Sequence, residues 1–366
     1  MYNNAGDSDT PRARAMTRNK TIIVATFVLV TVAAATYYWY FRHQRVDGLQ
    51  YVAPEDVGWS SQRLDSLKQL AQESGYAAIM AAYDGKVFFS WGETTRNFRI
   101  HSIRKPLESA LYGIHVSRGE IDLDETLEQL GIDDIPPSLT SAEKQATVRE
   151  LLQARSGVYH EAAAEDSTMI ELRPPRGSHP HGTFYYYNNW DFNVVTTIFN
   201  QKTGLDSLQA LKEEIADPIG MQDFSLDNCH YQYEPEKSQH PASQIRMSAR
   251  DLIRFGILYQ KNGSWMGQQV IPSSWIKEST ATYSVVDSDV GIGYGYMWKT
   301  IPEGSTMAQM VGGSGYYHTG IGVQAVIILP ELKLVLVELM DTDQPSWVDP
   351  GEAGMQLGLE IIKARN

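Results

Sequence analysis

The chain has 366 residues and a formal net charge of −13 at pH 7, so it can form one large domain or two modest ones. The acidic balance argues against a nucleic-acid partner. A single cysteine, Cys229, excludes an intramolecular disulfide and any C-x-x-C metal or redox site. His179 and His181 are the only close histidine pair. Because no third ligand is evident, we expect a surface loop there, and neither a metal nor a cofactor.

The N-terminal segment contains an uncharged, mostly apolar stretch at residues 21–41. About 20 apolar residues are sufficient to span a bilayer as a helix. Aromatic residues at 37–40 are typical of a membrane interface. Basic residues are more frequent before the stretch than close behind it, which predicts a cytoplasmic N-terminus; they are Arg12, Arg14, Arg18 and Lys20 before it and Arg42 and Arg45 after it.

These features predict a single-pass membrane protein. We expect a cytoplasmic tail at residues 1–20, an uncleaved transmembrane signal anchor at 21–41 and a linker at 42–58. Residues 59–366 would then form one domain on the periplasmic or extracellular side. The alternative is a secretory signal peptide that is cleaved near residues 33–35.

Beyond the linker, hydrophobic periodicity and turn signals predict both helices and strands. Asp84-Gly85 between two apolar runs is a strong signal for a two-residue hairpin turn. In chain order, the predicted elements are a helix from Ser60 or Ser61 to Gly75, a hairpin of strands at 77–83 and 86–91, a helix at 102–117, capping boxes at Thr140…Glu143 and Thr147…Glu150, helices at 189–202, 207–216 and 248–262, a hairpin of strands at 324–329 and 334–339, and a last helix around 355–362.

Strand pairs therefore lie at both ends of the domain, and helices fill its middle. This order predicts an α+β fold in which an antiparallel sheet combines N-terminal and C-terminal strands and is flanked by helices. The middle of the chain would form a helix-rich insert, and one transmembrane helix would precede the domain.

Ser102 and Lys105 are three residues apart at the start of a predicted helix, so both side chains lie on one face of a helical turn. Free N–H groups near a helix N-terminus can stabilise an oxyanion. Lysine can remove the serine proton only when it is neutral, so its pKa of about 10.4 must fall by roughly 2–3 units. The chain holds two further S-x-x-K pairs, at Ser141 and Ser274, but neither leads into a long apolar-faced helix before a Y-x-N motif.

Two other motifs that could serve acyl transfer follow along the chain. The run at residues 185–187 leaves two registers open for a Y-x-N motif, Tyr186…Asn188 and Tyr187…Asn189. His318-Thr319-Gly320 precedes a strand-like run, and the surrounding glycines permit close approach of the backbone to a ligand. A serine, a base, a second proton carrier and an oxyanion-binding strand are the groups required for a covalent serine ester.

The three motifs and their surroundings resemble the serine β-lactamase and penicillin-binding protein superfamily, in its class C and esterase-like branch. The likeness covers roughly residues 55–345. Further matching segments are 119–124 after the nucleophile helix, the T-x-x-x-L-L segment at 147–152 with Ser156-Gly157, Pro218-Ile219-Gly220-Met221, and the spacing of Tyr187 from Gly204, which favours the Tyr187/Asn189 register.

The resemblance implies a β-lactamase/DD-peptidase-like fold without metal or cofactor. It makes Ser102 the acyl-accepting nucleophile, Lys105 its activating partner and Tyr187 the proton shuttle to the leaving group. It assigns Asn189, His318, Thr319 and Gly320 to substrate binding, and the backbone N–H groups of Ser102 and Ile321 to the oxyanion hole.

The chain departs from the usual family pattern at His318, where many members carry lysine. A histidine has a pKa near 6.5 and is mostly neutral at pH 7, so it is a weaker partner for a substrate carboxylate. This departure predicts that neutral esters or amides are better substrates than carboxylate-bearing β-lactams.

Two functions are therefore expected from the sequence. The first is a membrane-anchored serine hydrolase that acts on a small or peptide-like ester or amide, a class that includes β-lactams and peptidoglycan-type peptides. The second is a non-catalytic, penicillin-binding-like sensor or cell-wall scaffold that keeps the fold. The sequence indicates neither the natural substrate nor the oligomeric state.

Overall fold

The computed structural model describes residues 1, 48–322, 324–345, 347 and 356–365. The predicted tail at 1–20 and signal anchor at 21–41 lie outside this part apart from Met1, as does the start of the predicted linker. Among the described helices, none is both long enough and apolar enough to cross a membrane. Residues 48–366 form one compact unit, and the description below concerns that unit.

The strands of this unit form one nine-stranded sheet and three small two-stranded sheets within the described residues. The order in the large sheet is β1-β3-β2-β15-β14-β13-β12-β11-β10. Its strands are β1 (Gln50–Tyr51), β2 (Tyr76–Tyr83), β3 (Lys86–Gly92), β10 (Ser284–Asp287), β11 (Ile292–Tyr294), β12 (Lys299–Ile301), β13 (Gly315–Gly320), β14 (Gln324–Leu329) and β15 (Leu334–Met340). The small sheets pair β4 (Phe98–Arg99) with β7 (Arg246–Met247), β5 (His230–Gln232) with β6 (Ala242–Gln244), and β8 (Ser264–Trp265) with β9 (Gln268–Gln269).

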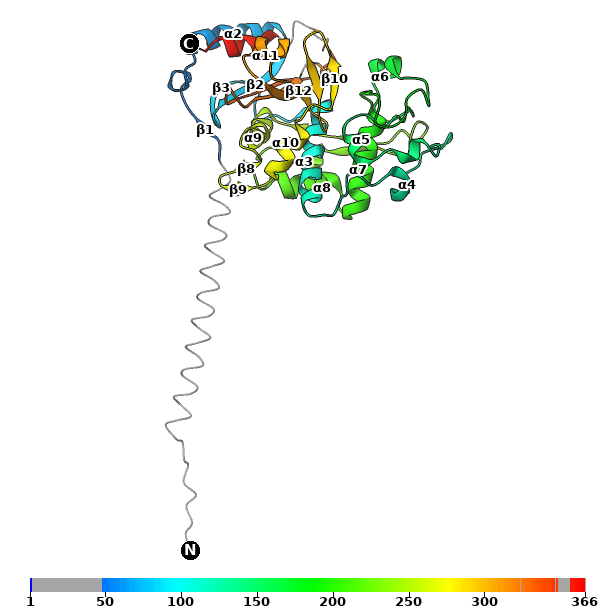
Figure 1. Ribbon diagram of the computed structural model, residues 1–366. Coiled ribbons are helices and arrows are strands. Elements are labelled where there is room, and N and C mark those ends of the chain that lie inside the picture. The colour runs from blue at the N-terminus through cyan, green and yellow to red at the C-terminus, as the bar shows by residue number, and fades with distance from the viewer. Residues whose placement is uncertain (2–47, 323, 346, 348–355, 366) are drawn as a thin grey trace. The chain divides into compact units, whose positions relative to one another are not determined.

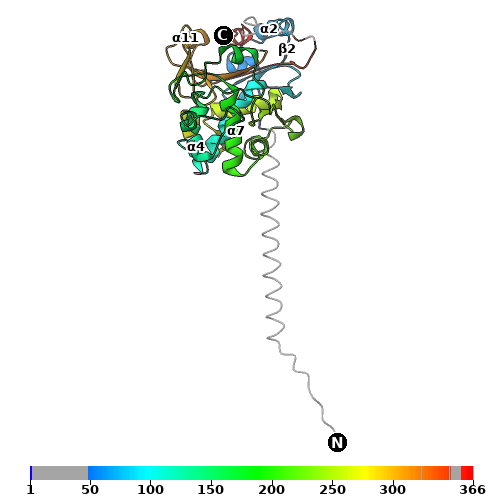
Figure 2. The ribbon, with the colours of Figure 1, turned by 90° about the vertical axis from the view of Figure 1, so that its right-hand side faces the viewer.

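Helices cover both faces of the large sheet (Figures 1 and 2). The α-helices are α2 (Ser61–Glu73), α3 (Arg104–Ser117), α4 (Leu127–Leu130), α5 (Val148–Leu152), α6 (Ser167–Leu172), α7 (Asn189–Thr203), α8 (Ser207–Ala210), α9 (Ala249–Gln260), α10 (Ser273–Ser279), α11 (Thr306–Val311) and α12 (Gln356–Lys363). Short 3-10 segments are Pro54–Val57, His101–Ile103, Glu143–Gln145 and Leu226–Asn228, and a π-helical turn, Leu211–Ala216, continues α8.

Two hydrophobic cores lie on opposite faces of the sheet, and β15 contributes to both. All its residues are buried. Leu334, Leu336 and Met340 join the core under α2, α11 and α12, whereas Val335, Val337 and Leu339 join the larger core around α3, α7 and α9. Because side chains alternate across a strand, only a central strand covered on both faces can be apolar at nearly every position.

The structure confirms the predicted architecture of an N-terminal hairpin, a helical middle and a C-terminal hairpin in one sheet. The pairs β2–β3 and β14–β15 are antiparallel, and the first has the Asp84-Gly85 turn. Ser60 accepts the capping bond of α2, and Thr147 and Glu150 form the predicted capping box of α5.

Three details differ from the prediction. Residues 50–51, predicted as linker, form β1, and β1 pairs in parallel with β3, so the sheet is mixed rather than purely antiparallel. Two exposed residues carry no hydrophobic alternation, so nothing in the sequence marks this strand. The strands β10–β12 were not predicted either, because three or four residues are too few to show a periodic pattern. The helix expected at 207–216 divides into α8 and a π-helical turn.

Candidate active site

Ser102 lies in a short 3-10 turn that leads directly into α3. The residue before it, His101, has φ +48°, a left-handed conformation that costs a non-glycine residue about 1–3 kcal/mol. The surrounding contacts hold this strained turn in place. Gln324 Nε2 donates a hydrogen bond to the carbonyl of Arg99 at 2.9 Å, and a side chain on Gly320 would come within 2.6 Å of the Ile100 carbonyl oxygen. Gly320 is therefore needed because β13 passes directly against the nucleophile turn.

Lys105 is the partner of Ser102. A hydrogen bond joins Lys105 Nζ and Ser102 Oγ at 2.9 Å, and the lysine side chain is fully buried. Its ammonium nitrogen lies 4.8 Å from the ring centres of both Tyr187 and Phe192. Burial, and then the positive charge of Arg104, hold the pKa of Lys105 well below its usual range. This is the direction of pKa shift that serine activation requires.

Arg104, which the sequence analysis did not single out, belongs to a buried polar network below the site. Its guanidinium donates to Glu108 Oε1 at 3.2 Å, to Ser243 Oγ at 3.2 Å and to Asn193 Oδ1 at 3.2 Å. Thr196 also donates to Glu108, at 3.1 Å. These partners satisfy the guanidinium group and hold its positive charge beside Lys105.

The contacts of the three tyrosines at 185–187 favour Tyr187…Asn189 as the Y-x-N motif. Tyr186 donates a hydrogen bond to the Met169 carbonyl, and the ring of Tyr185 packs against Tyr294. Tyr187 instead packs against Lys105, and burial raises its pKa although a hydrogen bond with Ser102 opposes the shift. Tyr187 therefore stays protonated near neutral pH and can donate a proton or a hydrogen bond beside Ser102.

Asn189 is the first residue of α7, and the side chain of Asn188 caps that helix by accepting from Asp191 N at 2.9 Å. Asn189 Nδ2 donates to the Ala164 carbonyl at 2.5 Å. Its Oδ1 atom is buried and has no hydrogen-bond partner, and the residue lines the polar cavity that also contains Ser102 and Lys105. An unpaired acceptor next to the nucleophile is available to a substrate N–H group.

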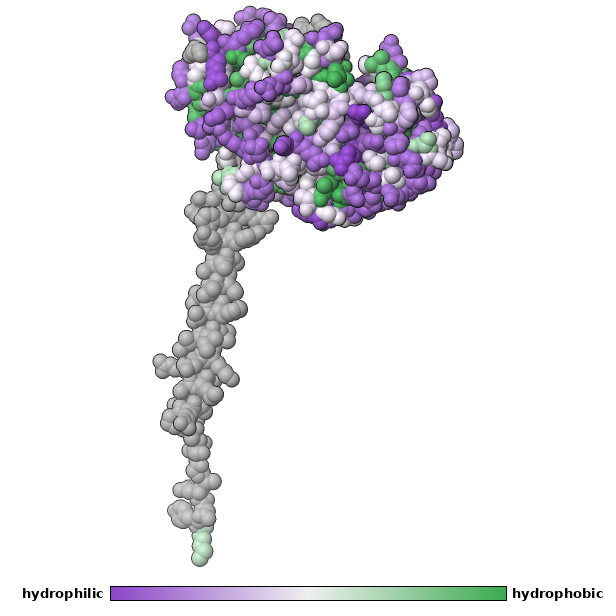
Figure 3. Space-filling view, in the orientation of Figure 1, coloured by the Kyte–Doolittle hydropathy of each residue, from purple (hydrophilic) through white to green (hydrophobic). Residues whose placement is uncertain are grey.

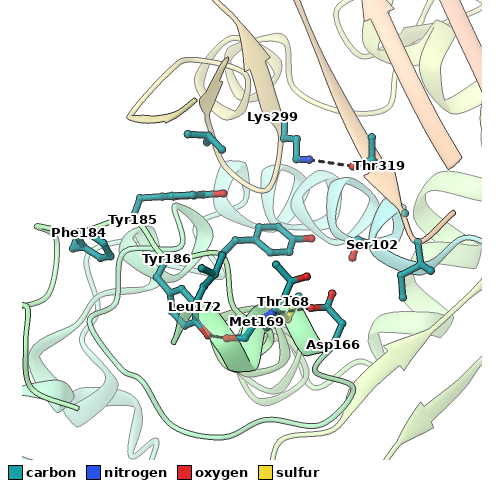
Figure 4. A pocket seen from close by; sticks show the side chains of 14 residues that line it. Ser102, Asp166, Thr168, Met169, Leu172, Phe184, Tyr185, Tyr186, Lys299 and Thr319 are labelled. Atoms are coloured by element: carbon teal, nitrogen blue, oxygen red, sulfur yellow. Dashed lines mark hydrogen bonds between the residues drawn. The ribbon is translucent and has the colours of Figure 1, made fainter. Parts of the chain in front are cut away.

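A cavity of about 610 Å³ opens in front of Ser102 (Figure 4). Thr319, Gly320 and Ile321, all predicted to bind substrate, line it together with Ser102 and Tyr187. A second cavity of about 350 Å³ lies away from Ser102, around residues 140–145 and 177–181. Ser102 and Tyr187 therefore lie at the larger cavity, and Lys105 lines the polar cavity that also contains Ser102.

His318 lies beside the catalytic residues, with its ring centre 6.1 Å from that of Tyr187. Its side chain is fully buried and does not line the cavities that contain Ser102. Side chains alternate along β13, so His318 faces the core while Thr319 faces the opposite side. Its Nδ1 atom lies 2.9 Å from the Thr319 carbonyl, and its Nε2 atom has no partner. Burial and the neighbouring Lys105 hold the pKa of His318 well below its usual range, so it is neutral at pH 7.

A different cation, Lys299, lines the cavity, and sequence reasoning missed it. Lys299 begins β12 and pairs with Tyr317 of β13. Its Nζ atom donates a hydrogen bond to Thr319 Oγ1 at 3.1 Å (Figure 4). Only the pairing of two strands places it near Ser102, so no local motif could have indicated it.

The other two S-x-x-K pairs are not assembled into a site. Lys144 forms an ion pair with Asp133, at 2.5 Å, and Ser141 is exposed. Ser274 and Lys277 are both exposed on α10. Of the three serines, the structure gives only Ser102 a lysine hydrogen-bond partner.

The family model described as Beta-lactamase matches residues 67–356, so this chain belongs to the β-lactamase family. No curated protein sequence matches it. Similar solved structures include a D-alanine carboxypeptidase from Burkholderia cenocepacia (16% identity, TM-score 0.62, covering 84% of this chain and 99% of that chain). Others are a β-lactamase from Mycobacterium bovis (18%, 0.57, 81% and 97%) and an octameric penicillin-binding protein homologue from Pyrococcus abyssi (18%, 0.58, 81% and 77%). The family model confirms the predicted family, and the solved structures confirm its fold.

Proposed function

We propose that this chain is a serine hydrolase that forms an acyl-enzyme on Ser102. The observation that carries the proposal is the 2.9 Å hydrogen bond between Ser102 and a buried lysine whose pKa is lowered. A lysine that is neutral near pH 7 can act as a general base, whereas an ordinary exposed lysine cannot.

The proposed reaction begins when Lys105 takes the Ser102 proton as Oγ attacks the substrate carbonyl carbon. The carbonyl oxygen becomes an oxyanion, for which we assign the backbone N–H groups of Ser102 and Ile321 as donors. The proton then passes through Tyr187 to the leaving oxygen or nitrogen, and the tetrahedral intermediate collapses to a serine ester. A water molecule hydrolyses that ester through the same groups in reverse, which returns Ser102 to its starting state.

The substrate in this proposal is an ester or an amide. Two of the similar structures are a D-alanine carboxypeptidase and a β-lactamase, which supports peptide-like and β-lactam amides as members of the class to be tested. The unpaired Oδ1 of Asn189 supports an amide, because an amide N–H group would satisfy that acceptor.

A non-catalytic sensor or scaffold remains the competing function for the same fold. It would bind a ligand at the cavity without covalent chemistry. The lowered pKa of Lys105 and its hydrogen bond to Ser102 favour the hydrolase, because a scaffold does not need a buried lysine whose charged form is disfavoured beside a serine.

The test is covalent labelling of the full chain in detergent with a fluorophosphonate probe, together with hydrolysis of 4-nitrophenyl butyrate. Ser102→Ala should abolish both signals. Ser141→Ala and Ser274→Ala are matched controls, because each removes the serine of another S-x-x-K pair, and both should remain active. Labelling and full hydrolysis by Ser102→Ala would exclude Ser102 as the nucleophile, and an unlabelled, inactive wild type would favour the scaffold.

We further propose that residues 21–41 anchor the chain as a single transmembrane helix with the N-terminus in the cytoplasm. The support is the length of the uncharged stretch and the excess of basic residues before it. The hydrolase domain would then act in the periplasm or outside the cell.

A further inference from the structure

We propose that a cavity between the large sheet and the helices α11 and α12 is a second binding site, and that its ligand is a small aliphatic amine whose ammonium group pairs with Glu338. The cavity has a volume of about 310 Å³. It lies in the core under α2, α11 and α12, and Ser102, Lys105 and Tyr187 do not line it. Its ligand is therefore distinct from the substrate of Ser102.

The walls of this cavity are mostly apolar. They come from β12, β14, α11 and α12, and include Ile301, Met307, Val311, Ile327, Leu359 and Ile362. Met310 also lines the cavity and is 53% exposed, and Figure 3 shows hydrophobic residues among hydrophilic ones at the end of the domain that carries α2 and α11 (labelled in Figure 1). An engineered apolar cavity of about 150 Å³ can bind benzene, so this one has room for a short aliphatic chain.

Glu338 is the one acidic side chain that lines the cavity among the described residues. It lies on β15 between Ala325 of β14 and Ile79 of β2, and it is only 3% exposed. Its Oε1 atom receives no hydrogen bond from any described residue. Gly358 of α12 leaves room in front of this oxygen, since a Cβ atom there would lie 3.2 Å from it. A buried acceptor without a partner, facing an open space, is a candidate ligand contact.

The carboxyl group favours an ammonium ligand over a neutral one. A hydroxyl group can donate to Oε1, but a cation also offsets the loss of hydration that burial imposes on the carboxylate. Burial raises the pKa of Glu338 to about 8, and no cation opposes that shift. The elements around Glu338 supply none within the described residues: α11 and β14 carry no basic residue, Lys363 of α12 pairs with Glu360 at 2.9 Å, and Lys299 of β12 donates to Thr319.

The second cavity shares one wall residue with the cavity at Ser102. Thr319 lines both. Asp166 lines the cavity at Ser102 (Figure 4), and its carboxylate is an alternative partner for an amine. A test of the second site must therefore distinguish Glu338 from Asp166.

The experiment measures the Kd of n-hexylamine by calorimetry on the full chain in nonionic detergent. At pH 9 Glu338 is mostly ionised, and the alkylammonium group is still charged. 1-Hexanol has the same chain without the charge, and hexanoate carries the opposite charge. Because the detergent is the same throughout, partition of a ligand into micelles affects every variant equally.

Two substitutions change the second cavity. Glu338→Gln removes the charge at nearly constant size. Ile362→Trp fills the cavity from α12. Leu67→Trp is the matched control for the second, because Leu67 is also a partly buried residue of this core but does not line the cavity.

Wild type should bind hexylamine more tightly than 1-hexanol or hexanoate. Glu338→Gln should weaken hexylamine binding by about 10-fold to 100-fold, the range for a hydrogen bond to a charged group, and change 1-hexanol binding by less than about twofold. Ile362→Trp should weaken the binding of both, and Leu67→Trp should leave both unchanged. Equal effects of Glu338→Gln on amine and alcohol, or no binding of hexylamine by wild type, would refute the proposed ligand. If Glu338→Gln fails to fold, equal hexylamine binding by Ile362→Trp and Leu67→Trp would refute the site.

Two variants at the first cavity separate this site from the proposed hydrolase function. Ser102→Ala and Asp166→Asn should both bind hexylamine as wild type does. Loss of binding in Asp166→Asn but not in Glu338→Gln would place the amine beside Ser102 and overturn the second site. A wild type that hydrolyses no ester but binds hexylamine through Glu338 would contradict the hydrolase proposal alone.

Discussion

The substitution Lys105→Arg tests the central step of the proposed chemistry. Arginine keeps the positive charge and most of the length, but its pKa above about 12 prevents it from accepting a proton. Lys105 can accept one because burial and Arg104 lower its pKa. The substitution therefore removes the base while leaving Ser102 and the cavity in place.

The expected loss follows from what each side chain can do at pH 7.4. A lysine with an ordinary pKa of about 10.4 would be neutral in roughly one molecule in a thousand, and burial increases that fraction in the folded chain. Loss of a general base lowers rates by roughly 10²–10⁴, which corresponds to about 3–5 kcal/mol of activation free energy. We expect a loss in this range in kcat/KM for 4-nitrophenyl butyrate and in the rate of fluorophosphonate labelling.

The pH profile and a control variant complete this test. Because the neutral form of Lys105 is the active one, kcat/KM of wild type should rise with pH and level off well below pH 10. Lys144→Arg, which changes the lysine of another S-x-x-K pair, should keep wild-type rates because Lys144 is paired with Asp133 instead. A Lys105→Arg variant within about tenfold of wild type would refute the role of Lys105 and require another activator of Ser102.

Four further outcomes are expected. Tyr187→Phe should lower kcat/KM roughly 10²–10⁴-fold at an unchanged melting temperature, since only the proton carrier is lost. Gly320→Ala should lower both melting temperature and labelling rate, because the new methyl group would lie 2.6 Å from the Ile100 carbonyl oxygen. Burial raises the pKa of Glu338 from 4.5 to about 8, so the folded chain retains a proton that the unfolded chain releases, and urea titrations should show stability falling between these pH values. Glu338→Gln should remove this slope. Protease added outside spheroplasts should remove the hydrolase domain if residues 21–41 are an uncleaved anchor, whereas a mature N-terminus near residue 36 would indicate a cleaved signal peptide.

The parts of the site that could be predicted from the sequence are those that local geometry determines. Ser102 and Lys105 are three residues apart, and any helical turn brings such residues together. The β2–β3 hairpin was predictable because the Asp84-Gly85 turn lies between its two strands. Neither prediction required knowledge of which distant segments of the chain pair with each other.

The parts that could not be predicted depend on strand order and on the face of a strand. Lys299 reaches Thr319 because β12 pairs with β13, and three-residue strands give no periodic signal from which to predict that pairing. His318 was expected to face the substrate, and the alternation along β13 buries it against Tyr187 while Thr319 lines the cavity. A shift of one residue in strand register would exchange the two, and a sequence alone does not fix that register.

The distribution of charge around Ser102 explains why a histidine is compatible with position 318. Arg104 is the fixed positive charge of the buried site, and Glu108 balances it at 3.2 Å. Arg104 lowers the pKa of both Lys105 and His318, after burial, and Lys105 lowers that of His318 as well. A permanent cation at position 318 would add to the positive field at Lys105, whereas a neutral imidazole does not.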